Sequence, residues 1–463
     1  ITELRAALKE ADELLLATDE DREGEAISYH VAEVLKLPAN KRYRATFTEI
    51  TKKAITTAIA NTLKDNKMID MNMVYAQFAR MVLDKLIGYK VSPLLWKEFA
   101  NYHLSCGRVQ SPVVKLIADR ETEIGKFASE SYFKLEACFQ IDKKQKTSII
   151  MTCCDEDIKD LTRIETLFQR EKDNDSKSPN IKWHIKSITT TQSKRNPSPP
   201  FITSTLQQDA SSKLGMSPDI CMKTAQKLYE AGLITYMRTD AVFIAEEAQK
   251  ALKIFIENKW GETYYRRMDY KTKNANSQEA HECCRPVDIS KESILGLGIE
   301  GMTAQHNRLY QLIWRRTIAS QMAPADIETI TVKINNSGVS AIPTIPVKSG
   351  KSSKSSKSKD ITNTETTTDE VFTFIGKFEK IIFEGYLVGV NIHKVKKTNS
   401  QGDILDDDNL YDDNLDDDNL DDDNPEDDND IKTNANTDIK QLEKIFSKLK
   451  EGNEVWVQRM RSE

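Results

Sequence analysis

A tyrosine and an arginine two residues apart form a combination of side chains that could carry out chemistry on a phosphate. Tyr236 and Arg238 lie in "GLITYMRTDA", directly after a segment with helical periodicity. The alternation of "LITYMRT" predicts an extended segment with both side chains on one face. An arginine fork suits phosphate oxygens, and a tyrosine hydroxyl can act as a covalent nucleophile. The pair indicates chemistry on a phosphate; a half-buried tyrosine beside a surface arginine is the simpler alternative.

A second reactive group consists of three acidic residues in "LLLATDEDREGEAI". Asp19, Asp21 and Glu23 are spaced by two after an apolar run, and Gly24 and a helical pattern follow. In open α/β sheets the functional crevice lies outside the carboxyl ends of the strands. Carboxylates crowded there repel one another unless a cation compensates, and Mg²⁺ is the oxygen-loving ion that fits. The alternative is a solvated turn whose acids are favoured by the helix N-terminus.

The elements that position these residues alternate along the chain. The first ~65 residues read as strand, helix, strand and helix ("ELLLAT", "GEAISYHVAEVLKL", "YRATFTEI", "TKKAITTAIANTL"), which is an α/β unit. A helix with Ser217 as N-cap, Pro218 at its first position and Gly232 at its end precedes the tyrosine. Strands are predicted around it, the last of them including "FTFIGKFEKIIFEGYLVGVNI". This order predicts one β domain from which a helical domain emerges.

Composition narrows the class of protein. The chain has 463 residues, 39% of them hydrophobic, which is enough for several cores. It contains no apolar run long enough for a membrane span and no signal-peptide pattern, although it begins without a methionine. None of the seven cysteines forms a CxxC pair, so neither a disulfide framework nor a zinc ribbon is expected.

The net charge of -6 conceals a basic body. Residues 403–430 hold 16 of the 72 acidic residues and no lysine or arginine, so the rest of the chain carries 66 basic against 56 acidic residues. That balance is compatible with a polyanionic partner. The acidic "DDDNL" repeat is expected to be disordered. The low-complexity stretches at 348–370 and 399–437 are expected to be loop insertions between strands.

Seven segments together resemble the type IA DNA topoisomerases. They stand in the family's order: "TDEDREGE", "FTEIT", "GYKVSPLLW", "SCGRVQSP", "PFITSTLQQDA", "LYEAGLITYMRTD" and "NSQEAHECCRP". Met237 after the tyrosine resembles the bacterial topoisomerase I branch more than topoisomerase III. The resemblance implies an α/β Toprim domain plus helical and β-rich domains, in an incomplete multidomain toroidal architecture.

The resemblance also implies an activity. A tyrosine would cleave single-stranded DNA through a 5′-phosphotyrosyl intermediate, another strand would pass, and religation would relax negatively supercoiled DNA without ATP. The expected partner is DNA, bound by a monomer with Mg²⁺ and without a nucleotide or a membrane; the cellular compartment stays open. The alternatives are a topoisomerase III-like decatenase and a cleavage-inactive DNA-binding fragment.

Individual roles follow from the motif matches. Tyr236 matches the nucleophile and Arg238 the arginine that polarises the phosphate, while Asp19, Asp21 and Glu23 match the acidic triad that holds Mg²⁺. The further catalytic positions are His281 and Glu23. The implied DNA contacts are Arg44, Arg80, Asp84, Ser105, Arg108 and Gln110.

The expected domain boundaries come from the order of the predicted elements and from the resemblance to the type IA topoisomerases. They are 1–66 for the Toprim domain, 67–128 for a helical groove domain, 129–198 and 322–463 for a β-rich arch, and 199–321 for the helical domain with the tyrosine. Four positions depart from the family: Met81 stands where an arginine is usual, Ala241 where a serine is usual, and Cys283 and Cys284 where small or aliphatic residues are usual. An earlier strand with a catalytic Glu, the rest of the gate domain and zinc ribbons are expected to lie outside this sequence, which would then be a fragment.

Overall fold

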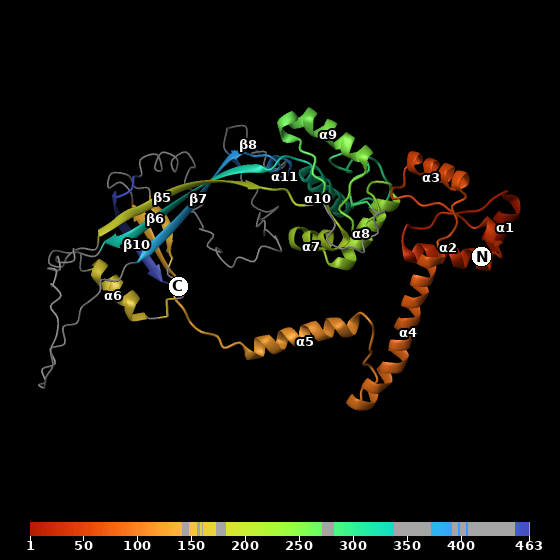
Figure 1. Cartoon of the computed structure of the whole chain (residues 1–463), viewed down its shortest axis with the longest axis horizontal. Helices are drawn as coiled ribbons and strands as arrows, with labels where there is room; N and C mark the ends of the chain where they lie inside the picture. The colour runs from red at the N-terminus through yellow and green to blue at the C-terminus, as the bar shows by residue number, and fades with distance from the viewer. Residues whose placement is uncertain are drawn as a thin grey trace, which may run out of the picture. The chain divides into compact units, whose positions relative to one another are not determined.

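The chain forms two compact units. A computed structural model describes residues 1–140, 148–154, 158–159, 161–172, 182–270, 282–337, 372–390, 397–398, 404–405 and 450–462 (Figure 1). Unit 1 comprises Ile1–Phe127, Asn196–Ala325 and Glu384–Leu415, and unit 2 comprises Ala128–Arg195, Asp326–Phe383 and Asp416–Glu463. His281, the stretch 348–370 and almost all of the acidic run lie outside the described residues. The finer division into five segments stays a prediction.

Unit 1 opens with the small α/β arrangement that the sequence predicts. Strands β1 (Leu15–Leu16) and β2 (Tyr43–Arg44) pair in parallel. The surrounding helices are α1 (Thr2–Glu10), α2 (Arg22–Val34), the 3₁₀ turn η1 (Ala39–Lys41) and α3 (Lys52–Asp65). Their shared core contains Leu16, Ala32, Leu37, Ile69 and Val74. Because these apolar side chains are buried together, they fix the position of β1. The acidic loop (residues 18–24), which carries Asp19, Asp21 and Glu23, follows this strand directly.

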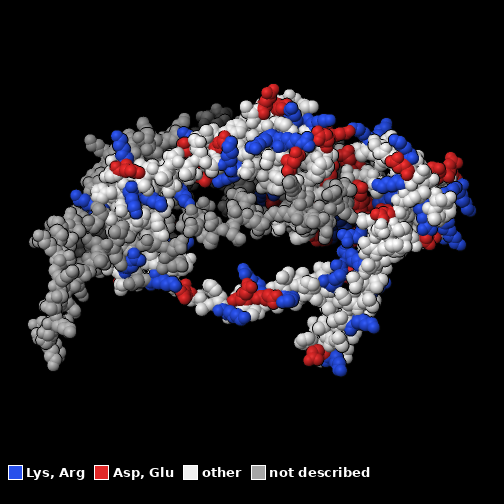
Figure 2. Space-filling model, in the orientation of Figure 1, with Lys and Arg blue, Asp and Glu red and all other residues white. Residues whose placement is uncertain are grey.

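Two long helices follow. Helix α4 spans Met71–Phe99 and α5 spans Gln110–Lys126. Only Val74 and Ser92 are buried on α4, and α5 buries no residue. The visible surface of α4 in Figure 2 is mainly uncharged, and several of its large apolar side chains are exposed, among them Tyr75, Met81, Leu86, Tyr89 and Leu94. Both helices are therefore largely exposed to solvent.

A helical bundle completes unit 1. It consists of α7 (Thr203–Leu214), α8 (Pro218–Glu230), α9 (Glu246–Trp260), the 3₁₀ turn η2 (Glu262–Tyr264) and α10 (Ala304–Ser320). Its core includes Leu228 and Trp314 and, from the tyrosine loop (residues 233–239), Ile234, Tyr236 and Met237. Helix α8 starts as predicted, because the hydroxyl of Ser217 accepts the backbone N–H of Ile220 at 3.4 Å and Pro218 follows. Gly232, at φ +69°, turns the chain after α8.

The predicted strand through "EGYLVGVNI" is wrong. Strand β7 ends at Phe383, and helix α11 (Leu387–Val390) follows. Gly385 adopts φ +49°, which breaks the extended run, and Tyr386 and Leu387 are buried in the core of the bundle. Apolar burial in a helical core overrides the strand pattern at this point. A short β8–β9 pair (Lys397–Thr398 with Ile404–Leu405) follows.

Unit 2 is a closed barrel in the order β10-β3-β4-β7-β6-β5. Its strands are β3 (Leu135–Gln140), β4 (Ser148–Cys153), β5 (Lys182–Arg195), β6 (Ala325–Ser337), β7 (Thr373–Phe383) and β10 (Glu454–Ser462). Phe139, Trp183 and Phe374 meet edge to face at its centre. Helix α6 (Leu161–Lys172) covers the barrel with Ile164 and Leu167. In the part of the chain that the structure describes, no helix has the length and apolarity of a membrane span.

Candidate active site

The acidic loop is shaped by the turn from β1 into α2. The hydroxyl of Thr18 donates to the carbonyl of Gly24 at 2.6 Å and lies 2.7 Å from the hydroxyl of Ser28. Asp21 is the N-cap of α2, where its Oδ1 accepts the N–H of Gly24 at 2.7 Å. A side chain on Gly24 would place its Cβ 2.1 Å from the carbonyl oxygen of Asp19. Only glycine lets the loop close this tightly.

Arg44 lies beneath this loop and is buried, and its expected DNA contact stays a prediction. The side chain is 1% exposed. Its Nε donates to Glu25 at 2.7 Å, and its terminal nitrogens donate to the carbonyls of Thr18 (2.9 Å), Asp19 (2.6 Å) and Ala45 (2.6 Å). Because the carbonyls at the end of β1 occupy the guanidinium, Arg44 holds the acidic loop from inside. Glu25 completes this support by accepting the N–H of Asp70 at 2.7 Å.

Tyr236 reaches the acidic loop from the helical bundle. Its hydroxyl donates to Oδ2 of Asp21 at 2.5 Å, and its residue is 4% exposed. The backbone N–H of Tyr236 donates to the carbonyl of Thr48 at 2.9 Å, and the ring meets Tyr229 edge to face at 5.2 Å. The predicted extended segment makes only a single bridge, Ile234 to Pro286, among the described residues. Specific contacts on both sides, and no sheet, thus fix the tyrosine.

The surroundings hold the Tyr236 phenol in its neutral form. Burial, the hydrogen bond to Asp21 and the charges of Asp21 and Asp19 raise the pKa of Tyr236 far above its usual range, and the charge of Arg238 lowers it. Deprotonation therefore requires an acceptor close by. The Asp21 carboxylate is in hydrogen-bond contact with that proton.

Arg238 lies on the solvent-exposed side of the tyrosine loop. Its residue is exposed. Within the described ranges it has neither a hydrogen bond nor an ion pair, yet its charge reaches both Asp19 and Tyr236. Its guanidinium is therefore available to an anion that approaches the tyrosine hydroxyl.

Two of the three expected metal ligands remain together. Partial burial and the charge of Asp21 raise the pKa of Asp19, against the lowering effect of Arg238 and Arg44, and Glu230 raises it further. Such repulsion is relieved by a cation, and one or two carboxylates with waters are the usual protein ligands of Mg²⁺. Asp19 and Asp21 thus fit Mg²⁺. No described group of three acidic, histidine or cysteine side chains surrounds a common point.

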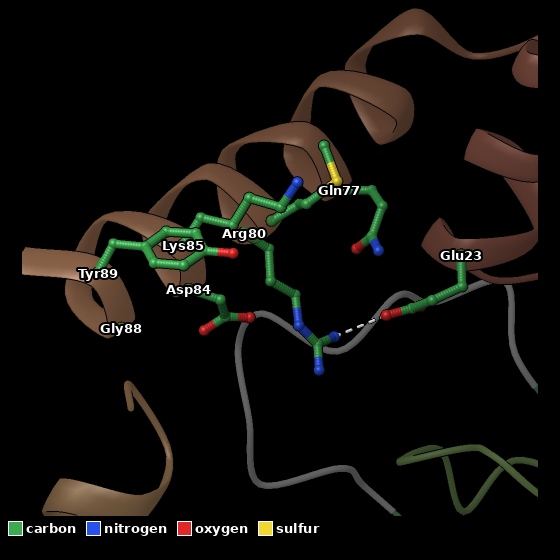
Figure 3. Close-up of a pocket in the computed structure, with 8 residues that line it drawn as sticks. Glu23, Gln77, Arg80, Asp84, Lys85, Gly88 and Tyr89 are labelled. Atoms are coloured by element: carbon green, nitrogen blue, oxygen red, sulfur yellow. Dashed lines mark hydrogen bonds and ion pairs between the residues drawn. The ribbon is translucent and has the colours of Figure 1, made fainter. Parts of the chain in front are cut away.

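Glu23 departs from the expected triad because it faces helix α4. Its Oε1 accepts from Nη1 of Arg80 at 2.7 Å, as Figure 3 shows. This pair lies at the rim of a cavity of about 530 Å³, whose other lining residues include Asp84, Lys85 and Tyr89. Glu23 therefore links the acidic loop to the surface of α4 through Arg80.

The remaining expected DNA contacts lie on or near α4. Asp84 accepts from Nε of Arg108 at 3.0 Å, which brings Arg80, Asp84 and Arg108 to one surface. The Ser105 hydroxyl instead donates to Oε1 of Gln110, the first residue of α5, at 3.3 Å. The indole N–H of Trp96 donates to the carbonyl of Leu104 at 2.6 Å. His281 lies outside the described residues, so its catalytic role stays a prediction.

Four site residues were not singled out from the sequence: Glu49, Tyr229, Glu230 and Arg285. Burial and the acidic loop raise the pKa of Tyr229 to about 12, which places it beside that loop. The four stand inside the motifs "FTEIT", "LYEAG" and "EAHECCRP", but their types alone do not predict which residues they meet. Contacts between distant segments carry that information.

Comparison with known proteins agrees with this geometry. The profile of the DNA topoisomerase family matches residues 68–349, and the Toprim domain profile matches residues 1–50. A mimivirus protein from Acanthamoeba polyphaga mimivirus, named DNA topoisomerase 1 type prokaryotic, is 43% identical over 73% of this chain and 40% of its own length. DNA topoisomerase 1 of Zymomonas mobilis is 40% identical over 71% of this chain and 26% of its own length. The chain thus spans well under half of these relatives.

A solved structure extends the agreement to the fold. Full-length topoisomerase I from Thermotoga maritima matches 100% of this chain and 61% of its own, with a TM-score of 0.64 and 27% sequence identity. The predicted Toprim and type IA topoisomerase fold is thereby confirmed. A family match over more than half of the sequence, joined to a tyrosine that touches a Toprim acidic loop, shows that this chain belongs to the type IA DNA topoisomerases of the bacterial topoisomerase I kind.

Proposed function

We propose that this protein relaxes negatively supercoiled DNA by transient cleavage of one strand, with Tyr236 as the nucleophile. The observation that carries the proposal is the 2.5 Å hydrogen bond from the Tyr236 hydroxyl to Asp21, beside the exposed guanidinium of Arg238. The acidic loop and the tyrosine loop thus bring together a nucleophile (Tyr236), an acceptor for its proton (Asp21) and a cation for the phosphate (Arg238). The partner is single-stranded DNA within the duplex, bound by a monomer, and no nucleotide is required.

Cleavage is an in-line displacement at phosphorus. Oη of Tyr236 forms the new P–O bond while the bond from phosphorus to the 3′ oxygen breaks, and the phenol proton moves to the Asp21 carboxylate. The departing 3′ oxygen takes up a proton from water and becomes a hydroxyl. Arg238 stabilises the negative charge on the non-bridging oxygens of the phosphate, as a charge-assisted fork does.

Religation is the reverse reaction. The 3′ hydroxyl gives its proton to water and attacks the phosphorus of the 5′-phosphotyrosine; the bond from phosphorus to Oη of Tyr236 breaks, and the phenolate recovers its proton from Asp21. Because one phosphodiester linkage is exchanged for another and then restored, the cycle needs no ATP. Passage of a second strand through the open break, between the two reactions, changes the linking number.

Magnesium fits the pair formed by Asp19 and Asp21. When bound, it would neutralise negative charge around the scissile phosphate. The Asp21 carboxylate offers about four lone-pair positions, so acceptance from Tyr236 and from Gly24 leaves room for a further contact. Arg44 and Glu25 hold the loop that carries both aspartates.

A relaxation assay tests the proposal. The protein, with Mg²⁺ and without ATP, is expected to relax negatively supercoiled plasmid, and activity should disappear in EDTA. Asp19→Asn together with Asp21→Asn should abolish relaxation but retain binding of single-stranded DNA, since the removed charges repel phosphate. Normal relaxation by this double variant would show that the acidic loop is only a helix cap.

A further inference from the structure

The segment Thr48–Thr51 contacts the tyrosine loop through its backbone. The carbonyl of Thr48 accepts the N–H of Tyr236 at 2.9 Å. The carbonyl of Ile50 lies where a Cβ on Gly232 would come within 2.6 Å. These two backbone contacts place the segment after β2 against the loop that carries the nucleophile.

Arg285 joins the same loop from the other side. The backbone N–H of Arg285 donates to Oγ1 of Thr235 at 2.9 Å, and the backbone carbonyl of Arg285 accepts the N–H of Thr235 at 2.9 Å. Thr235 directly precedes Tyr236, so the backbone of Arg285 sets the position of the nucleophile. The Arg285 guanidinium is 6% exposed and is held by Glu282 at 2.5 and 2.9 Å.

One contact of Arg285 crosses to the Thr48–Thr51 segment. Its Nη2 donates to Oε2 of Glu49 at 3.3 Å, which is longer than either bond to Glu282. The side chain of Glu49 is 23% exposed, against 6% for Glu282. The strong ion pair thus lies within the tyrosine side of the interface, and the weaker, wetter one lies across it.

This asymmetry matters if the two sides must separate. Breaking a buried ion pair is costly when one charge remains buried without a partner. Here Arg285 would keep Glu282 on separation, and Glu49 would return to water. The crossing pair can therefore open without leaving an unpaired buried charge.

We propose that the Glu49–Arg285 pair is a releasable latch between the Toprim side and the tyrosine loop, and that Arg285 is a positioning residue for Tyr236. The inference rests on the proposed function, since strand passage requires these two sides to part. When the Glu49–Arg285 pair is formed, the tyrosine loop stays against the Toprim side and Tyr236 contacts Asp21. When the pair is broken, the tyrosine loop keeps its contacts with Arg285 in the helical bundle.

Hydrogen exchange of two adjacent amides tests the latch without DNA. The N–H of Tyr236 bonds across the interface to Thr48, whereas the N–H of Thr235 bonds to Arg285 on its own side. Glu49→Gln is expected to speed exchange at Tyr236 about fivefold, the effect of losing a modest ion pair, and to leave Thr235 unchanged. Residue-resolved exchange by mass spectrometry measures both amides in one sample.

The matched control is Lys53→Gln. Lys53 pairs with Glu247 across the same interface, but both side chains are more than 70% exposed, at 74% and 79%. Such a pair contributes little, so exchange at Tyr236 should match that of the unaltered protein. Unchanged exchange at Tyr236 in Glu49→Gln would overturn the latch, and so would an equal rise at Tyr236 and Thr235. The exchange experiment contains no DNA, so its result does not depend on cleavage. A failure to cleave DNA in a separate assay would contradict the proposed function and not the latch.

Discussion

The Asp21 carboxylate links the nucleophile to the helix at residue scale. One of its oxygens caps α2 through Gly24, and the other accepts the hydroxyl of Tyr236. An N-cap carboxylate is fixed in position by the helix it caps. The phenol is therefore oriented by the start of α2, and its proton faces the group that is proposed to accept it.

Arg238 provides a prediction at the same scale. Arg238→Ala should slow cleavage of a labelled single-stranded oligonucleotide about 100-fold, as expected when a charged contact to the transition state is removed. DNA binding should change little, since one exposed charge is lost. Arg308→Ala removes another exposed arginine of unit 1, on α10, and is the control. Equal single-turnover rates for the two variants would remove Arg238 from the chemistry.

The types of these residues predicted their chemistry better than their partners. Tyr236 and Arg238 suggested phosphate chemistry from their spacing alone, but the contact between Tyr236 and Asp21 joins positions 215 residues apart. No residue spacing in the sequence predicts this contact. The burial of Arg44 was not predicted, because backbone carbonyls satisfy its guanidinium and carbonyls leave no pattern in a sequence.

The β1–α2 turn is the decisive element of the site. Gly24→Ala would drive a Cβ into the backbone of Asp19, 2.1 Å away, where no flexible side chain can yield. We expect a loss of about 1–3 kcal/mol in the free energy of unfolding of unit 1, with loss of relaxation because Asp19 moves. Chemical denaturation followed by circular dichroism measures the stability.

Gly125→Ala is the matched control for this change. Gly125 lies within α5, and a Cβ there meets nothing within 4 Å. Alanine favours a helix over glycine by up to about 1 kcal/mol, so this variant should be as stable as the unaltered protein or more stable. If Gly24→Ala is as stable and as active as Gly125→Ala, the turn does not require glycine.

Most elements were predictable because their signals are local. Ser217 and Pro218 define the start of α8, and the apolar alternation of the barrel strands reports one buried face. Helix α11 was missed because its apolar residues are equally suited to a strand, and burial in the bundle core decides between the two. The pairing of Glu49 with Arg285 was not predicted either, because it depends on how segments distant in the sequence pack together.

Charge is the property that acts at the scale of the whole molecule. Outside residues 403–430 the chain has a surplus of ten positive charges, while that run carries 16 carboxylates. A tethered polyanion has a high local concentration and can compete with DNA for lysine and arginine. Replacing the run with a Gly/Ser linker of equal length should tighten binding of single-stranded DNA at low ionic strength, with the difference shrinking as salt rises. Equal affinities across a salt titration, measured by fluorescence anisotropy, would make the run inert.

The covalent intermediate gives the most direct measurement. The protein is incubated with a single-stranded oligonucleotide and Mg²⁺, denatured, digested with trypsin and examined by mass spectrometry. Catalysis by Tyr236 predicts a peptide with a nucleotide joined through its 5′ phosphate to Tyr236, a second fragment that ends in a 3′ hydroxyl, and no adduct with Tyr236→Phe. An adduct on another residue, or one that persists in Tyr236→Phe, would contradict it.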